Sequence, residues 1–334
     1  MAARSQGREP NRAEYLGMVR RSKRFIALAL AASFIVLLLL AVFGGFGRVI
    51  SIILSANPVY FAMAILFVLL SYLVRFVKWL YLLRRLKIQL PLWKGLAIYL
   101  SAYSMELTPG RAGRVVVGYT LDRVTKKRFM KVAPIVTMDI FSDFLGFALL
   151  TLFAAFFFKK YIIYVVFAVA LLSITFLFVL NDKPYRFLRE GRYTKGFMRR
   201  FSPSINTYFA SQNVLGDHKT YAVSTMFAIP ADVLNASALY FSLLALGFVP
   251  NIGQVIFVFA VAQIFGMVSF IPGNIGVTDA ALVTLIGATF GTNSAINSAA
   301  TILTRIATLW FGVLLGMAFL IYTMRYWIPR RGGS

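Results

Sequence analysis

Long apolar stretches alternate with short basic segments along this chain. Residues 25–47 are 23 residues without a charge, and roughly 20 apolar residues are enough for an α-helix to cross a bilayer. Stretches of this kind predict an all-α polytopic membrane protein with six transmembrane helices. The predicted helices cover about residues 25–46, 58–83, 132–157, 161–180, 219–247 and 296–324.

Two further apolar stretches, 84–131 and 251–291, are each interrupted by the pattern P-G-x-x-G. Proline lacks a backbone donor and clashes with the preceding helical turn, and glycine adopts the backbone angles that follow such a break. Each stretch therefore predicts a broken helical hairpin, either re-entrant or of two full crossings, and the arms of 251–291 are long enough to cross. The predicted hinge residues are Pro109, Gly110, Gly113, Pro272, Gly273 and Gly276.

Composition and charge agree with a membrane protein. The chain is 60% hydrophobic and 14% charged, whereas about a quarter of a soluble domain is charged. Its net charge of +24 would also suit a nucleic-acid-binding protein. However, 29 of its 35 Lys and Arg residues lie in four segments, 1–24, 84–131, 181–219 and 325–334. Such segregation follows the positive-inside rule, so we expect no nucleic-acid partner.

The basic segments predict the domain organisation and the topology. Residues 1–24 form a basic cytoplasmic segment, 25–325 a transmembrane domain and 326–334 a cytoplasmic tail. Both termini then lie on the cytoplasmic side of the plasma membrane. The basic loop 181–218 contains hydrophobic residues among its charges and is expected on the inner membrane surface.

The order of the predicted elements indicates an inverted-topology repeat. In the half 58–157 the hairpin enters from the cytoplasmic side, and in the half 219–324 it enters from outside. Repeats of this kind place a substrate site near the bilayer midplane, between the halves. The alternative is coincidence, since Pro-Gly turns are common in membrane proteins.

Ionisable residues inside the predicted membrane segments are candidates for a binding site, because intramembrane charge is costly. The free N–H groups at the start of each second hairpin arm favour an anion. Arginine side chains match phosphate oxygens in bidentate geometry. We therefore predict a site for the phosphate of a lipid head group. Its predicted residues are Arg111, Arg114, Asp139, Asp143, Asp279 and Arg305.

The basic candidates also have structural interpretations. Arg111 and Arg114 are alternatively topology charges on the cytoplasmic side. Arg75 and Lys78 are expected to snorkel from the inner end of their helix to the membrane surface. Arg305 is harder to explain in this way, because it lies deep in an apolar segment.

The acidic candidates have structural interpretations as well. Asp139 and Asp143 lie four residues apart, so they share one helix face and are alternatively partners of a nearby arginine such as Arg75 or Arg114. Asp279 is alternatively a cap of the second hairpin arm, together with Thr278. Asp232 is alternatively a partner for backbone groups at a proline kink.

No feature of the sequence indicates an enzyme. The chain has no cysteine and a single histidine, and no acid or histidine cluster has the spacing of metal ligands. It contains neither a nucleotide-binding loop nor a hydrolase nucleophile motif. We expect no catalytic residue, no metal and no cofactor.

Several segments resemble the lysylphosphatidylglycerol synthase transmembrane (flippase-like) family over roughly residues 20–325. They are TPGRAGR at 108–114, VTMDIFSDFLG at 136–146, FIPGNIGVTD at 270–279, and Thr304, Arg305 and Trp310. The family resembles the membrane half of bacterial multiple peptide resistance factors, which move aminoacylated phosphatidylglycerol between leaflets. Similar domains accompany glycosyltransferases that act on polyprenyl-phosphate sugars.

The resemblance implies a central site and a substrate class. The implied site residues are Pro109, Gly113, Asp139, Pro272, Gly276, Asp279 and Arg305. The family often has a glutamate where this chain has Arg114, and this departure favours an anionic head group over a cationic aminoacyl one.

These observations predict a protein that flips a phosphate-bearing lipid or a polyprenyl-phosphate-linked glycolipid. The expected partners are membrane lipids, namely an anionic phospholipid or polyprenyl phosphate, and a possible glycosyltransferase. Two other functions stay open: a non-transporting membrane partner of a glycosyltransferase, and an ion-coupled transporter of small anions.

Overall fold

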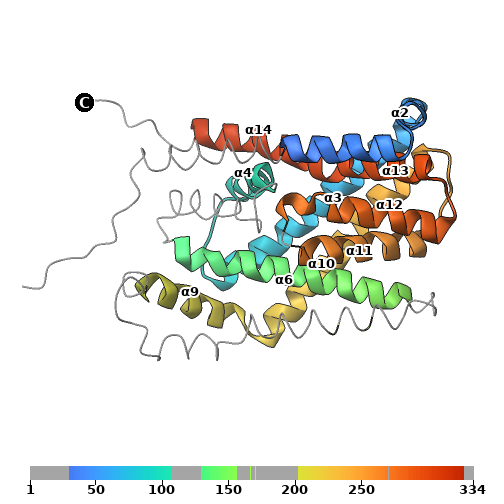
Figure 1. The fold of residues 1–334 in the computed structure, drawn as a ribbon. Helices are drawn as coiled ribbons and strands as arrows, with labels where there is room; N and C mark the ends of the chain where they lie inside the picture. Colours follow the sequence, from blue (N-terminus) through green and yellow to red (C-terminus); the bar gives the residue numbers. More distant parts are fainter. Residues whose placement is uncertain are drawn as a thin grey trace, which may run out of the picture.

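A computed structural model describes residues 30–106, 129–155, 166, 170, 202–269 and 271–326. All regular secondary structure within these ranges is helical (Figure 1). The helix Leu30–Phe43 comes first. It is followed by α2 (Phe46–Leu54), α3 (Pro58–Arg85), α4 (Leu92–Ser101), η1 (Ala102–Met105), α6 (Phe129–Ala155), α9 (Ser202–Leu215), α10 (His218–Ala245), α11 (Ile252–Val268), η6 (Pro272–Asn274), α12 (Val277–Phe290), α13 (Ser294–Arg305), η7 (Ile306–Trp310) and α14 (Phe311–Tyr326).

Four helical segments in the described ranges are long and apolar enough to cross a membrane. They are α3, most of α6, α10, and the continuous helix Ser294–Tyr326 formed by α13, η7 and α14. These segments confirm four predicted helices and a multi-pass helical membrane protein. The predicted helix 161–180 lies outside the described residues.

The predicted first helix, about residues 25–46, corresponds to the helix Leu30–Phe43 within the described residues. The helix Leu30–Phe43 is followed by α2 at an angle of 103°. The turn falls at Gly45, whose positive φ of 85° is accessible mainly to glycine. At Gly44 a side chain would overlap Val49 and Ser298. The turn therefore lies at the predicted end of this helix, whereas α2, which follows it, was not predicted.

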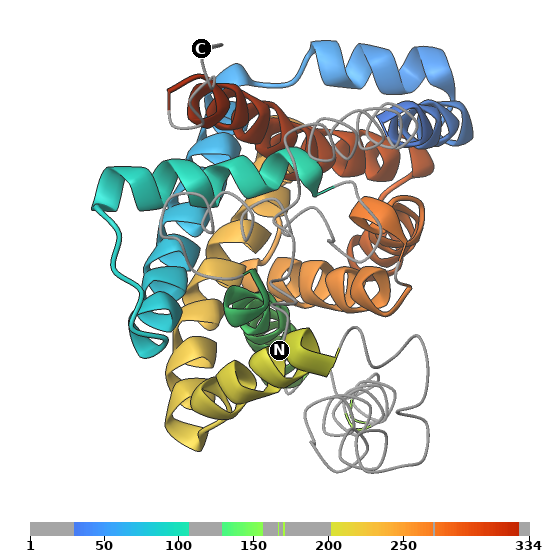
Figure 2. The same ribbon diagram turned by 90° about the vertical axis from the view of Figure 1, so that its left-hand side faces the viewer.

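The central pair of the fold is α3 and α10, which pack along each other (Figure 2). On one side α6 packs against α10 and α11, and on the other α14 packs against α4 and η1. In each case the helix that follows one hairpin contacts the first arm of the other hairpin. The two sequence halves are therefore interleaved.

The arms of the second hairpin are shorter than predicted. Helix α11 has 17 residues and α12 has 14, which correspond to roughly 26 and 21 Å. A hydrocarbon core is about 30 Å thick, so the expectation that each arm is long enough to cross is wrong. Of the first hairpin, α4 and η1 are described, whereas its break at 109–113 lies outside the described residues.

The loop predicted at 181–218 ends in a helix, α9, which packs against α6. After it, Asp217 accepts a hydrogen bond from the Thr220 amide at 3.0 Å and so caps α10. Arg85, at the end of α3, pairs with the same carboxylate at 2.8 Å. Hydrogen bonding from Thr220, with a smaller contribution from Arg85, lowers the pKa of Asp217.

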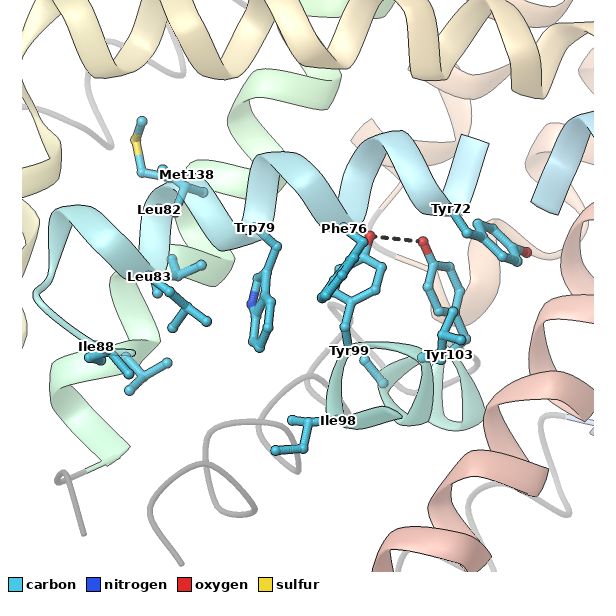
Figure 3. Close-up of a cluster of buried hydrophobic side chains, with 14 of the residues drawn as sticks. Tyr72, Phe76, Trp79, Leu82, Leu83, Ile88, Ile98, Tyr99, Tyr103 and Met138 are labelled. Atoms are coloured by element: carbon cyan, nitrogen blue, oxygen red, sulfur yellow. Dashed lines mark hydrogen bonds between the residues drawn. The ribbon is translucent and has the colours of Figure 1, made fainter. Parts of the chain in front are cut away.

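An aromatic cluster joins α3 to α4 and η1 (Figure 3). The rings of Tyr72 and Tyr103 lie 4.2 Å apart between centroids, and Trp79 and Tyr99 lie 5.6 Å apart. The hydroxyl groups of Tyr99 and Tyr103 are hydrogen-bonded at 3.1 Å. This cluster holds the first arm of hairpin 1 against the central helix pair.

Small residues bring α14 against the same arm. A side chain on Gly312 would overlap the Tyr72 hydroxyl, and one on Gly316 would overlap the backbone of Tyr103 and Ser104. Small residues four apart allow helices in membranes to approach this closely.

Replacing Gly316 with alanine should therefore destabilise the protein. The added methyl group meets the backbone of Ser104, which cannot move aside as a side chain can. We expect a loss of about 1–3 kcal/mol, typical of overpacking, measured as a lower unfolding temperature in detergent. Gly47→Ala is the matched control, because nothing lies within 4 Å of that position. Equal unfolding temperatures for the two variants would contradict the close packing.

Candidate functional site

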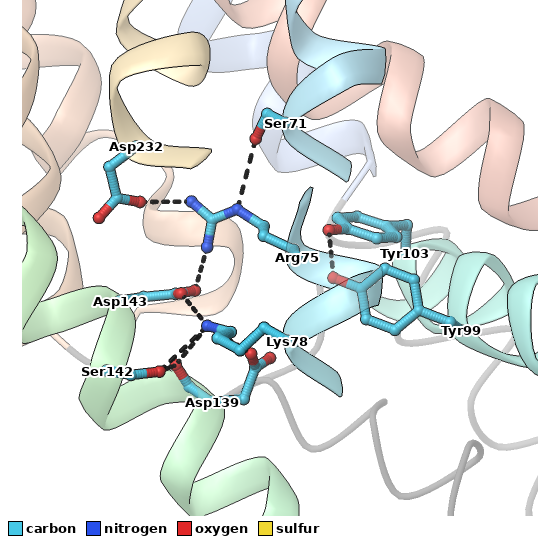
Figure 4. A network of polar contacts seen from close by, with 9 residues as sticks. All are labelled: Ser71, Arg75, Lys78, Tyr99, Tyr103, Asp139, Ser142, Asp143 and Asp232. Carbon is cyan, nitrogen blue, oxygen red and sulfur yellow. Dashed lines mark hydrogen bonds and ion pairs between the residues drawn. The ribbon is translucent and has the colours of Figure 1, made fainter. Parts of the chain in front are cut away.

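A buried group of ion pairs connects α3, α6 and α10 (Figure 4). Arg75 of α3 lies at its centre. One terminal nitrogen pairs with Asp143 of α6, and the other donates to Asp232 Oδ1 of α10 at 2.5 Å. Its Nε donates to Ser71 Oγ at 3.4 Å. A single guanidinium is thus shared between two carboxylates.

Lys78, one turn further along α3, extends this group. Its Nζ lies 2.7 Å from Asp139 Oδ1 and 2.5 Å from Asp143 Oδ1. It also donates to Ser142 Oγ at 3.0 Å. The predicted position of Asp139 and Asp143 on one helix face is confirmed, because both carboxylates bind the same ammonium group.

The expectation that Arg75 and Lys78 snorkel to the membrane surface is wrong. Their exposed fractions are 7% and 0%. The Arg75 head group reaches α6 and α10, and that of Lys78 reaches α6. Burying charges is favourable only when good geometry and hydrogen bonds offset the lost hydration. The three aspartates provide both. Asp232 likewise binds Arg75 and does not serve backbone groups at a kink.

A second ion pair holds the break of hairpin 2. Arg305, at the end of α13, lies with its Nε 2.7 Å from Asp279 Oδ1 of α12. Its Nη2 donates to the Gly273 carbonyl at 2.9 Å. The exposed fractions are 5% for Arg305 and 2% for Asp279. Arg305 therefore binds both the turn and the helix that follows it.

The backbone of this break explains its sequence. Gly273, Asn274 and Gly276 have positive φ angles of 61°, 54° and 81°. Glycine adopts such angles freely, and asparagine does so more readily than most other residues. The pattern P-G-x-x-G thus places both of its glycines where the chain reverses.

The start of α12 is already occupied by a carboxylate. Asp279 Oδ2 accepts a hydrogen bond from the Gly276 amide at 2.7 Å. The prediction of free N–H groups at this end is therefore incomplete, whereas the capping interpretation of Asp279 is confirmed. Thr278 does not join the cap, because its buried hydroxyl has no hydrogen-bond partner in the described part of the chain.

A short π-helical stretch, η7, directly follows Arg305. Wider turns of this type occur often at functional sites. The Thr308 carbonyl within it accepts a hydrogen bond from Tyr72 at 2.9 Å. This contact connects the helix that carries Arg305 to α3, which carries Arg75.

A cavity of about 190 Å³ lies between the two ion-pair groups. Its described lining comes from both hairpins and from α3, α6, α10, α11, α13 and η7. The charged lining residues are Arg75, Glu106, Asp143 and Arg305, and the polar ones include Tyr72, Tyr103, Asn235, Gln263 and Asn274. The residues just before the first break therefore line the same cavity as the second break itself.

The predicted site residues are distributed unevenly around this cavity. Arg305, Asp143 and Gly273 line it. Asp139 and Asp279 belong to the ion pairs around it. The remaining predicted residues of the first break lie outside the described residues: Pro109, Gly110, Gly113, Arg111 and Arg114.

Sequence reasoning left Arg75, Lys78 and Asp232 out of the predicted site. The sequence did mark these three residues as candidates, because each is an ionisable residue inside an apolar helix. The polar residues Asn235 and Gln263 were not considered at all. Asn235 follows Asp232 by three residues, a spacing that puts both on one helix face.

Comparison with known proteins agrees with the suspected family. A family model described as "Lysylphosphatidylglycerol synthase TM region" matches residues 25–316. A search of curated proteins found no match.

Substitution of Arg305 tests the role of the second ion pair in stability. Arg305→Ala leaves the buried Asp279 carboxylate without its cation, which typically costs about 3–5 kcal/mol. The double variant Arg305→Ala with Asp279→Asn should lose less than the single variants Arg305→Ala and Asp279→Asn lose together, because neither charge is left unpaired. Denaturant unfolding in detergent provides the three free energies of unfolding. Additive losses would show that the pair is not energetically coupled.

Proposed function

The chain belongs to the lysylphosphatidylglycerol synthase TM region family, whose model matches residues 25–316, and from this premise we propose that it moves a lipid between leaflets. The substrate is a phosphate-bearing lipid or a polyprenyl-phosphate-linked glycolipid. The family name relates this membrane domain to lipid modification or transport. In our proposal the chain is not an enzyme, because it moves its substrate without changing it.

The cavity between the ion-pair groups is the observation that carries this proposal. It presents two buried guanidinium groups, Arg75 and Arg305, and guanidinium forks match phosphate oxygens. Its volume of about 190 Å³ is sufficient for a small head group. In our proposal the acyl or prenyl chains stay in the membrane.

The charges around the cavity are relevant to the charge of the head group that it would bind. Among the described lining residues, Arg75 and Arg305 are balanced by Glu106 and Asp143. A phosphate must therefore compete with carboxylates for the guanidinium groups. We propose that Arg111 and Arg114, from the first break, supply the additional positive charge that favours an anionic head group.

The packing of the helices supports an inverted repeat. Helix α6 packs on α11, and α14 packs on α4 and η1. Exchanging the halves converts one of these pairings into the other, as a pseudo-two-fold axis in the membrane plane requires. In the proposed arrangement both hairpins are re-entrant, with six transmembrane helices around them. The short arms α11 and α12 support this view.

The proposed setting is the plasma membrane, with both termini in the cytoplasm. The distribution of Lys and Arg supports this orientation. A glycosyltransferase that uses the translocated lipid-linked sugar is a proposed partner.

A transporter of small anions is the second candidate, favoured by the size of the cavity. Such a protein would bind inorganic phosphate without a lipid tail. A non-transporting partner of a glycosyltransferase would need neither the cavity nor its buried arginines. Lipid exchange in reconstituted liposomes separates these functions.

The purified chain should accelerate leaflet exchange of fluorescent phosphatidylglycerol or of a polyprenyl-phosphate analogue. Arg305→Lys keeps the charge but loses the fork that binds Asp279 and Gly273. Hydrogen bonds to charged groups contribute about 1.5–3 kcal/mol, so exchange should slow about tenfold or more. Arg85→Lys is the matched control, because Arg85 is partly exposed and pairs only with Asp217 and Val214 among the described residues. Its exchange rate should equal that of the wild type.

Exchange at the protein-free rate for both lipids would reject lipid translocation. If the protein instead accumulated inorganic phosphate, the small-anion transporter would be favoured. If it did neither, the non-transporting role would stand.

A further inference from the structure

Asp232 is the least satisfied carboxylate of the buried network. It lies near the middle of α10 and is fully buried. Oδ1 accepts from Arg75 at 2.5 Å, but Oδ2 has no hydrogen-bond partner among the described residues. An unpaired buried oxygen of an ionised carboxylate is costly, and such a group often becomes neutral instead.

The packing around Asp232 shows why Oδ2 lacks a partner. This oxygen faces Gly146 of α6, where even a methyl group would overlap it. Ala228, also on α10, lies beside the same position. The surface next to Oδ2 is therefore apolar. Among the described residues, only Arg75 forms an ion pair with Asp232.

The cation that binds Asp232 is itself shared. Arg75 also pairs with Asp143, and Lys78 is divided between Asp143 and Asp139. Among the described residues of this network, three carboxylates face two cations. Asp232 is the one that Lys78 does not contact within salt-bridge distance.

The other helices packed against α10 add few charges. Helices α11 and η7 contain no charged residue. The charge on α13 is Arg305, which is bound to Asp279 of α12. From α3 and α6 the facing groups are Arg75, Lys78, Asp139 and Asp143. The Tyr72 hydroxyl of α3 donates to the Thr308 carbonyl. No basic group in the described part of the chain other than Arg75 reaches Asp232.

We propose that Asp232 is a proton-binding site that links lipid translocation to proton movement. This inference rests on the proposed function. A proton from water binds the Asp232 carboxylate, which then no longer attracts Arg75 as an anion. Arg75 lines the cavity, and its Nη2 group, released from Asp232, becomes available to a phosphate oxygen.

The charges balance in this scheme. A phosphodiester head group brings one negative charge into the cavity, and the proton brings one positive charge. Binding is therefore electroneutral, which reduces the cost of bringing a head group into the membrane interior. When the lipid leaves, Asp232 releases its proton and Arg75 returns to it. A proton gradient can then drive the lipid in one direction.

Binding of a soluble short-chain phosphatidylglycerol to the full chain in detergent provides the test. Calorimetry in two buffers of different ionisation enthalpy measures proton uptake, which should approach one proton per lipid. As the pH rises, Kd should weaken by up to about tenfold for each pH unit. In liposomes, an imposed pH gradient should bias lipid exchange in one direction.

Asp232→Asn should abolish both the proton uptake and the pH dependence of Kd. Asp217→Asn is the matched control, because it removes an aspartate outside the network and should keep both. If Asp232→Asn does not fold, Asp232→Glu replaces it. That variant keeps a carboxyl group, so it should still take up a proton when the lipid binds. The pH at which the proton uptake is half-maximal should be shifted from that of the wild type.

The outcomes separate this inference from the proposed function. Lipid binding and exchange without proton uptake in the wild type would overturn the proton site and leave lipid translocation intact. Unchanged uptake in Asp232→Asn, or an unmoved midpoint in Asp232→Glu, would exclude Asp232. Absence of lipid binding and exchange at every pH would reject the proposed function itself.

Discussion

A charge buried inside a membrane must be paired, and this constraint organises the protein. Breaking a buried pair typically costs about 3–5 kcal/mol, so the residues that provide the partners hold the helices in place. Arg75 and Lys78 fasten α3 to α6 and α10. Arg305 fastens α13 to the break before α12. The cavity lies where these two groups of ion pairs approach each other.

The same pairing makes the site suitable for exchange of partners. Arg75 divides its charge between two carboxylates, and Arg305 divides its donors between Asp279 and a backbone carbonyl. In the proposed function, a phosphate that enters the cavity replaces one partner without leaving a guanidinium unpaired. The shared groups would thus hold the fold together and also bind the head group.

Much of the fold could be predicted from local patterns, but the pairing could not. The length and hydropathy of 58–83 and 219–247 predicted α3 and α10, because a transmembrane helix depends mainly on its own sequence. Arg75 and Asp232 are 157 residues apart, and no spacing rule relates them. Arg75 was expected to snorkel from the inner end of its helix, but it lies ten residues, roughly 15 Å, before Arg85 at the end of α3. The capping role of Asp279 was visible locally as an alternative, whereas its pairing with Arg305 required the folded hairpin.

The central claim is that a phosphate-bearing head group occupies the cavity between the two ion-pair groups. Native mass spectrometry of the protein released from lipid nanodiscs tests this most directly. The wild type should retain a phosphate-bearing lipid. Ile140→Trp, which fills the cavity from a lining position on α6 without changing a charge, should lose it. Retention of the same lipid by both proteins would contradict the account.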